Sequence, residues 1–268
     1  MLSLGFSPCP NDTFIFHALT HRAVNLHEYY FSVVIDDVEE LNRRAAERTL
    51  NITKVSCAAY VGVRDHYRFL RSGGAFGRGC GPLVIAREPA DAGFLNARTV
   101  AIPGELTTAF LLVRLLCEAA GLKPSRFVPM AFHEVMPAIA AGRADAGVII
   151  HEGRFTYRDL GLHALIDLGS WWEETTGLPI PLGGIIAEKK LGDIVIRDIE
   201  QIILASVRHA FAHPEAAMPY IRQHAQEMAD DVIRRHIQLY VNEFTLDIGR
   251  EGQAALDELV QRAAAARF

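Results

Sequence analysis

The sequence predicts an α/β protein with two lobes and a ligand cleft between them. Short apolar runs rich in β-branched residues alternate with longer stretches of helical period, which is typical of βα units around a largely parallel sheet. The pattern restarts near Thr99, which indicates a second layer of this kind. A chain of 268 residues has room for one large domain or two ordinary ones, and a cleft between lobes is a common position for a small-molecule site.

The first unit begins at the N-terminus with a short apolar strand. Asn11 or Asp12 is expected to start the helix that follows, and Ser56 can cap a later helix through its hydroxyl. A glycine-rich loop precedes the last strand of the unit. The expected elements are strands at 2–6, 30–35, 52–55 and 82–87 and helices at 13–20 and 38–47.

The second unit is expected to be inserted into the first. Its first helix starts at Thr107 or Thr108 and stops at Gly121. The run GLPIPLGG at 177–184 is dense in turn formers and carries the chain back to the first unit, beyond which the pattern is mostly helical. The other expected elements are strands at 99–102, 146–150 and 164–168 and a helix at 133–141. We therefore expect lobe 1 to comprise residues 1–98 and 183–268, and lobe 2 residues 99–182.

The composition argues against nucleic acid, a membrane and a metal ion as partners of this chain. The chain has 27 Lys and Arg against 32 Asp and Glu, a net charge of −5, so it lacks the basic excess of a nucleic-acid-binding protein. No apolar run reaches the length of a membrane span. The four cysteines are scattered and the first six residues already look like a strand, so we expect a cytoplasmic protein without a signal peptide. His17 and His21 lack a third ligand, and no metal site is expected.

Polar residues follow the predicted strands, where α/β proteins bind ligands. Pro10, Asn11 and Asp12 form either a cleft wall or simply a rigid turn into a helix. Backbone amides, a hydroxyl and an ammonium at Lys54, Val55 and Ser56 can hold an anionic or hydroxylated ligand, although a solvated lysine beside a helix cap has the same pattern.

Two further positions belong to the second unit. Thr107 and Thr108 offer hydroxyls and free amides at a helix start, where negative charge is favoured, or serve as an ordinary cap. His151 follows a buried strand directly and can act as a general base, with a structural strand-end histidine as the alternative. Glu152 either orients its ring or, as adjacent residues often do, points away from it. Cys9 and Cys57 are either nucleophiles or small buried thiols.

Six long segments of the chain carry a family resemblance. They are SPCPNDTFIF at 7–16, TKVSCAAY at 53–60, RSGGAFGRGCGPLV at 71–84, IIHEGRFTY at 149–157, DLGSWWEETTGLPIPLGG at 167–184 and YVNEFTLDIG at 240–249. Together these segments resemble one enzyme family, the 1,4-dihydroxy-6-naphthoate synthases of the futalosine route to menaquinone. The resemblance covers nearly the whole chain, and one departure is Gly153, which stands where a serine is expected in this family.

The resemblance implies a two-lobed fold like that of type II periplasmic binding proteins. It implies a lyase that converts cyclic dehypoxanthine futalosine, a small carboxylated substrate, to 1,4-dihydroxy-6-naphthoate without a metal or organic cofactor. His151 is then the proton acceptor, and the substrate-binding segments fall on Lys54, Val55 and Ser56 and on Thr107 and Thr108. Two alternatives stay open: a chorismate-dehydratase-like enzyme of the same pathway and a non-catalytic solute-binding protein. The oligomeric state is left open as well.

Overall fold

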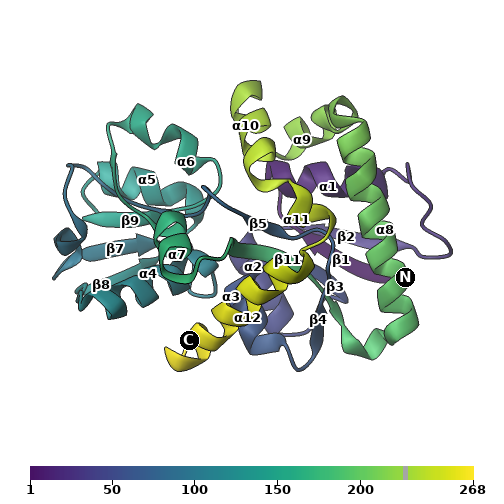
Figure 1. Ribbon diagram of the computed structural model, residues 1–268. Coiled ribbons are helices and arrows are strands. Elements are labelled where there is room, and N and C mark those ends of the chain that lie inside the picture. The colour runs from purple at the N-terminus through teal and green to yellow at the C-terminus, as the bar shows by residue number, and fades with distance from the viewer. Residues whose placement is uncertain (226–228) are drawn as a thin grey trace.

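The computed structural model describes residues 1–225 and 229–268, which form two lobes, each built around one β-sheet (Figure 1). The chain passes from the first sheet to the second in the glycine-rich stretch after residue 77 and returns at residue 180. The second lobe is therefore an insertion in the first, as expected for an α/β chain whose pattern restarts.

The first sheet has six strands in the order β2-β1-β3-β11-β4, with β5 also paired to β11. The strands β1, β2 and β3 are parallel, whereas β11 runs antiparallel to β3. The sheet is thus mixed and not largely parallel. Its strands are β1 (Leu2–Phe6), β2 (Phe31–Ile35), β3 (Ile52–Ser56), β4 (Tyr67–Phe69), β5 (Ala75–Gly77) and β11 (Ile180–Glu188).

Helices cover this sheet because they bury apolar stripes against it. The hydroxyl of Ser206 accepts from the Leu19 amide at 3.1 Å and donates to the Ile15 carbonyl at 2.6 Å, which locks α8 to α1 within an apolar core. The helices of this lobe are α1 (Pro10–Thr20), α2 (Val38–Ala46), α3 (Cys57–Val63), α8 (Asp193–Ala212), α9 (Met218–His224), α10 (Asp230–Tyr240), α11 (Glu243–Leu246) and α12 (Gly249–Ala265), with short 3₁₀ helices at Lys189–Leu191 and Pro214–Ala217.

The second sheet has five strands in the order β10-β6-β9-β7-β8. The helix α4 ends at Gly121, which takes the left-handed conformation with φ 66° that glycine adopts without strain. The strands are β6 (Leu83–Ala86), β7 (Thr99–Ile102), β8 (Arg126–Pro129), β9 (Ala146–Ile149) and β10 (His163–Asp167); the helices are α4 (Thr108–Ala120), α5 (Phe132–Ala140), α6 (Gly153–Thr156) and α7 (Leu168–Thr176), with 3₁₀ helices at Ala92–Leu95 and Tyr157–Leu160.

The sheets divide the chain differently from the boundaries expected at 98 and 183. The strand β6 pairs with β9 and β10 and so belongs to the second sheet. An apolar run predicts a buried strand but not the partner it pairs with, which is why the pattern misplaced it. The strand β11 begins at Ile180, inside the run expected to be turns, because Gly177 alone ends α7 and the following residues pair with β5.

The C-terminal helix α12 belongs to the first lobe by sequence but packs against the second as well (Figure 1). Leu256 and Leu259 share one apolar core with Trp172 of α7, and Arg262 lies 5.3 Å from the centre of the Trp172 ring. Beyond the helix, the ring of Phe268 lies 5.8 Å from that of Phe110 in α4. The two lobes therefore share a continuous apolar contact beside the connecting strands.

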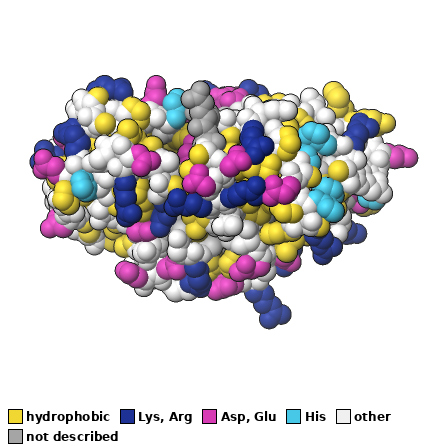
Figure 2. Space-filling model, turned by 90° about the horizontal axis from the view of Figure 1, so that it is seen from above, with side chains coloured by type: hydrophobic (Ala, Val, Ile, Leu, Met, Phe, Trp, Pro, Cys, Tyr) yellow, Lys and Arg dark blue, Asp and Glu magenta, His cyan; other side chains and the backbone are white. Residues whose placement is uncertain are grey.

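Acidic and basic side chains are interspersed over the face shown in Figure 2, in line with the nearly balanced composition. Among the residues described, no helix is both long and apolar enough to cross a membrane.

Candidate active site

A cavity of about 90 Å³ lies between the lobes, where strands of both sheets end. It collects eight of the nine residues predicted to form the cleft wall, bind the substrate or act as the base; Pro10, the first residue of α1, is buried but does not line it. The lining residues are Ser7, Asn11, Asp12, Val38, Lys54, Val55, Ser56, Ala75, Gly81, Pro82, Thr107, Thr108, Ala109, Ile150, His151, Leu182, Gly183 and Tyr240.

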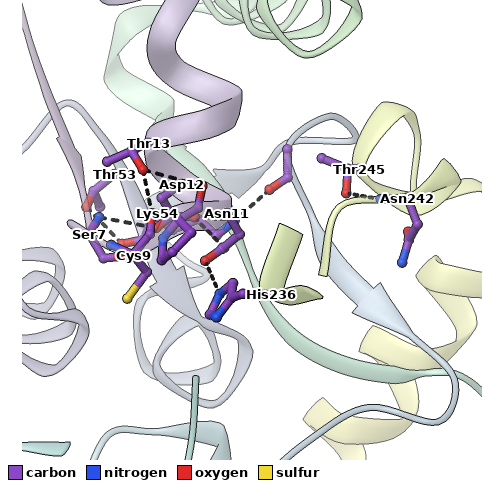
Figure 3. A network of polar contacts seen from close by, with 12 residues as sticks. Ser7, Cys9, Asn11, Asp12, Thr13, Thr53, Lys54, His236, Asn242 and Thr245 are labelled. Carbon is purple, nitrogen blue, oxygen red and sulfur yellow. Dashed lines mark hydrogen bonds and ion pairs between the residues drawn. The ribbon is translucent and has the colours of Figure 1, made fainter. Parts of the chain in front are cut away.

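Asp12 is the centre of a buried polar network on the first lobe (Figure 3). Its carboxylate accepts from the Ser7 hydroxyl at 2.7 Å and from the Asn11 amide nitrogen at 2.9 Å. The Lys54 ammonium lies 3.2 Å from the same carboxylate and donates to the Gly73 carbonyl at 2.8 Å. Both charged side chains are almost fully buried, so the Lys54 charge is balanced inside the protein.

Two helix starts differ from the expected caps. The residue before α1 is Cys9, and Asp12 lies inside the helix, where its carboxylate faces Ser7 and Lys54. The Ser56 hydroxyl makes no helix-capping bond; it accepts from the Asn42 side chain at 3.1 Å, while the Ser56 amide donates to the Asn42 carbonyl oxygen at 2.9 Å. Asn42, which the sequence did not indicate, does not line the cavity but holds Ser56, which does.

The two threonines at the start of α4 make different hydrogen bonds. Thr107 caps the helix, because its hydroxyl accepts from the Phe110 amide at 3.2 Å. The Thr108 hydroxyl accepts from the Ala58 amide at 3.2 Å and donates to the Leu182 carbonyl at 2.8 Å. Thr108 therefore ties the second lobe to α3 and β11 of the first.

Replacing Thr108 by valine is expected to lower the free energy of unfolding by about 1–3 kcal/mol, because the Ala58 amide and the Leu182 carbonyl lose a buried partner. Urea unfolding measures the loss. The control Ser206→Ala also removes a buried hydroxyl but within one lobe, so only T108V should weaken protection of the interlobe amides from hydrogen exchange. Unchanged protection in T108V would contradict the interlobe role.

His151 has an unusual conformation directly after β9. Its φ is 55°, in the left-handed region that residues other than glycine adopt uncommonly. The ring packs edge-on against Phe132 at 5.1 Å, and the Nε2 atom is buried without a hydrogen-bond partner among the described residues. Glu152, expected to orient the ring, makes no hydrogen bond to it, and its own Oε2 is likewise buried and unpaired there.

His236 of α10, which the sequence did not indicate, does not line the cavity but lies directly behind two residues that do, Asn11 and His151. Its ring is fully buried, nearly parallel to that of His151 at an angle of 18° and 6.1 Å away. Its Nε2 lies 3.0 Å from the Asn11 side-chain oxygen. Burial, and then the proximity of His151, hold the pKa of His236 well below its ordinary value of 6.5.

This low pKa predicts a loss of stability in mild acid. Below pH 6.5 the unfolded chain gains a proton at His236 that the fold does not, so the free energy of unfolding falls between pH 6.5 and the lowered folded pKa, by up to about 1.4 kcal/mol per pH unit. Above pH 6.5 the contribution is constant. Urea unfolding between pH 5 and 8 gives the free energy of unfolding against pH for wild type and for His236→Gln. The other histidines titrate in both proteins, so a difference between the two slopes belongs to His236, and equal slopes would refute the prediction.

The cysteines near the site do not have the environment of nucleophiles. Cys9 and Cys57 are free and buried, and burial raises the pKa of both thiols far above neutrality. They are therefore small apolar packing groups in this structure. The described residues contain no group of three or more His, Cys, Asp or Glu side chains arranged to hold a metal ion.

Comparison with known proteins places these features in a family. A family model described as menaquinone biosynthesis matches residues 2–265. The chain belongs to this menaquinone biosynthesis family. Two curated relatives, from Thermus thermophilus and Streptomyces coelicolor, are 51% and 50% identical to it, cover 98% of the chain and 94% and 93% of their own lengths, and are both named 1,4-dihydroxy-6-naphthoate synthase.

Solved structures confirm the fold of this family member. An Archaeoglobus fulgidus protein is 32% identical, with a TM-score of 0.90 over 98% of this chain and 97% of that one. The periplasmic aliphatic sulphonate binding protein of Escherichia coli, at 13% identity, superposes with a TM-score of 0.68 over 99% and 87% of the two chains. The predicted two-lobed architecture like that of periplasmic binding proteins is thereby confirmed.

Proposed function

We propose that this protein is a carbon–carbon lyase that converts cyclic dehypoxanthine futalosine to 1,4-dihydroxy-6-naphthoate. The observation that carries the proposal is His151, which lines the cavity between the lobes and has a buried Nε2 without a hydrogen-bond partner among the described residues. Membership of the menaquinone biosynthesis family and two relatives at about half identity that are named 1,4-dihydroxy-6-naphthoate synthase support the pathway and the product.

The reaction asks for a base and for a site that holds negative charge. Retro-aldol cleavage removes a proton from a hydroxyl group; the carbon–carbon bond breaks as the carbonyl forms, and its electrons move into an adjacent carbonyl group of the substrate. His151 accepts the proton. The resulting oxyanion is held by hydrogen-bond donors, and aromatisation to the naphthoate favours the products.

The donors available are backbone amides and the Ser56 hydroxyl more than free cations, because the hydroxyls of Thr107 and Thr108 already donate to the Gly104 and Leu182 carbonyls. Lys54 is paired with Asp12, so it adds little net positive charge to the cavity. The amides of Thr108 and Ala109 lie in the first turn of α4, where they lack acceptors within the helix and the helix dipole favours an anion. Ser56, Thr107 and Thr108 are the residues that bind the substrate carboxylate or the oxyanion in this proposal. Lys54 and Val55 line the cavity beside them.

The cavity is too small for the substrate as it stands. About 90 Å³ is well below the roughly 300–1,000 Å³ typical of sites for ligands of this size. The lobes must therefore separate to admit a bicyclic carboxylate that carries a sugar, and their closure excludes water from the reaction. Asn11 and Asp12 then form part of the cleft wall.

A cytoplasmic location and a small carboxylated substrate belong to the same proposal. All four cysteines are free and buried, as expected in a reducing compartment. Localisation of a tagged chain in a cell that uses this pathway tests the compartment.

The decisive assay incubates the purified protein with cyclic dehypoxanthine futalosine, without added metal or cofactor, and follows the naphthoate by absorbance. We expect the naphthoate to form at a rate proportional to the concentration of folded enzyme. Turnover of chorismate instead would favour a dehydratase, and tight binding of the futalosine without turnover would favour a solute-binding protein; either result overturns the proposal.

A further inference from the structure

We infer that His236 of the first lobe is a positioning residue, which holds the ring of His151, the general base in the second lobe, in its orientation. This inference rests on the proposed role of His151. His236 lies on α10 and His151 follows β9, so their contact crosses the cleft. The two rings are nearly parallel, and each has a buried nitrogen without a hydrogen-bond partner among the described residues.

The hydrogen bonds around Asn11 determine the tautomer of His236 (Figure 3). A carboxylate only accepts hydrogen bonds, so the amide nitrogen of Asn11 faces Asp12, and its oxygen faces His236. Nε2 of His236 must then carry the proton and donate it, which leaves Nδ1 as a lone pair. Since Lys54 holds Asp12 in place, the orientation of the His236 ring is anchored in the sheet of the first lobe.

His151 lacks an anchor of this kind. General bases are usually oriented by a hydrogen bond from a third group, yet the His151 ring makes none among the described residues, and Glu152 does not reach it. Its ring is instead held by aromatic packing: Phe132 from its own lobe lies 5.1 Å away at 70°, and His236 from the other lobe 6.1 Å away at 18°. One of the two surfaces that position the base is therefore present only when the lobes are together.

The chemistry around His236 fits a rigid, neutral surface. The ring of Tyr240, one turn later on α10, lies 4.8 Å away, and that of Phe155 on α6 lies 6.5 Å away with Arg235 stacked on its outer side. A neutral imidazole in this setting does not compete for the proton that His151 takes up, and its flat face restricts how the His151 ring rotates. The flat ring of His236 is therefore the part that positions His151, whereas the hydrogen bond to Asn11 holds the His236 ring itself in place.

Three substitutions separate these elements. His236→Phe keeps a flat ring and loses the donor to Asn11, His236→Gln keeps a donor at the ε position and loses the ring, and His236→Ala loses both. His209→Gln is the matched control, because His209 also has a buried unpaired Nδ1 and packs on a histidine, but that histidine is His213 and not His151.

Steady-state kinetics are measured at a temperature at which circular dichroism shows every variant to be folded. We expect H236A and H236Q to lower kcat about 10–100-fold with KM changed less than about threefold, because a misplaced base is costly while the binding wall is kept. H236F should recover most of the lost kcat, and H209Q should match wild type. Wild-type kcat in H236A, or rescue by glutamine and not by phenylalanine, would overturn the inference.

A second measurement needs no substrate. In ¹H–¹³C spectra of the histidine rings, the His151 resonance, assigned through His151→Asn, should shift in H236A and stay near its wild-type position in H209Q. An unmoved resonance in H236A contradicts the contact even if the enzyme proves to act on another substrate. Absence of turnover in wild type with a shifted resonance would count against the proposed function and in favour of the contact.

Discussion

Replacing His151 by asparagine is expected to lower kcat by about 10²–10⁴-fold, the usual contribution of a general base, while the substrate still binds. Asparagine is the appropriate substitution because the residue has a φ of 55°, a conformation that asparagine adopts more readily than alanine or most other residues. The side chain also remains polar and small enough for the space between Phe132 and the cavity. Initial rates and calorimetric titration of the variant with the futalosine substrate measure both effects.

His163 provides the control for this experiment. It is an exposed histidine at the start of β10 in the same lobe, so H163N changes the same side chain without touching the cavity. We expect wild-type rates from H163N. A wild-type rate from H151N would eliminate His151 as the base, and loss of both binding and turnover would indicate a wall residue instead.

The second large effect is expected at Asp12. Asp12→Ala leaves the Lys54 ammonium buried beside the Gly73 carbonyl with no carboxylate, which should lower the free energy of unfolding by about 3–5 kcal/mol. The Ser7 hydroxyl and the Asn11 amide lose their acceptor as well. Urea unfolding monitored by circular dichroism measures this change. An m-value equal to that of wild type shows that the two proteins expose the same surface on unfolding, so that their free energies can be compared.

Two further variants show whether the loss comes from the unpaired charge. Adding Lys54→Met to Asp12→Ala removes the orphaned ammonium, so the double variant should be more stable than D12A alone. Asp193→Ala breaks an ion pair with Arg68 whose side chains are 73% and 47% exposed, and should have little effect. A double variant no more stable than the single one would show that the charge is not the cause.

Local patterns predicted the elements of this fold well and their assembly less well. The strand at 99–102 and the helix that starts after Thr107 and ends at Gly121 agree with the structure, because an apolar run, a capping hydroxyl and a left-handed glycine are local signals. The strand at 83–86 was recognised but placed in the wrong lobe. Which sheet a strand joins depends on partners that are distant in sequence, here β9 and β10.

The candidate site shows the same limit. Strand ends marked Lys54, Ser56 and His151, a helix start marked Thr108, and all four residues line the cavity. Their partners were not visible: Lys54 looked like a free cation, yet Asp12, 42 residues earlier, neutralises it (54 − 12 = 42). His236 fits the apolar stripe of an ordinary helix, and nothing in that stripe indicates that it meets a histidine from the other lobe.

The position of β11 has a consequence for how this protein is made. Ile185 of β11 pairs with Lys54 of β3, a separation of 131 residues (185 − 54 = 131), and the whole second sheet lies between them in the chain. During synthesis, β3 therefore waits with one edge unpaired until β11 leaves the ribosome, and an exposed strand edge invites aggregation. The inserted lobe can fold first, so we expect the nascent first lobe to be the part of this chain that depends on chaperones.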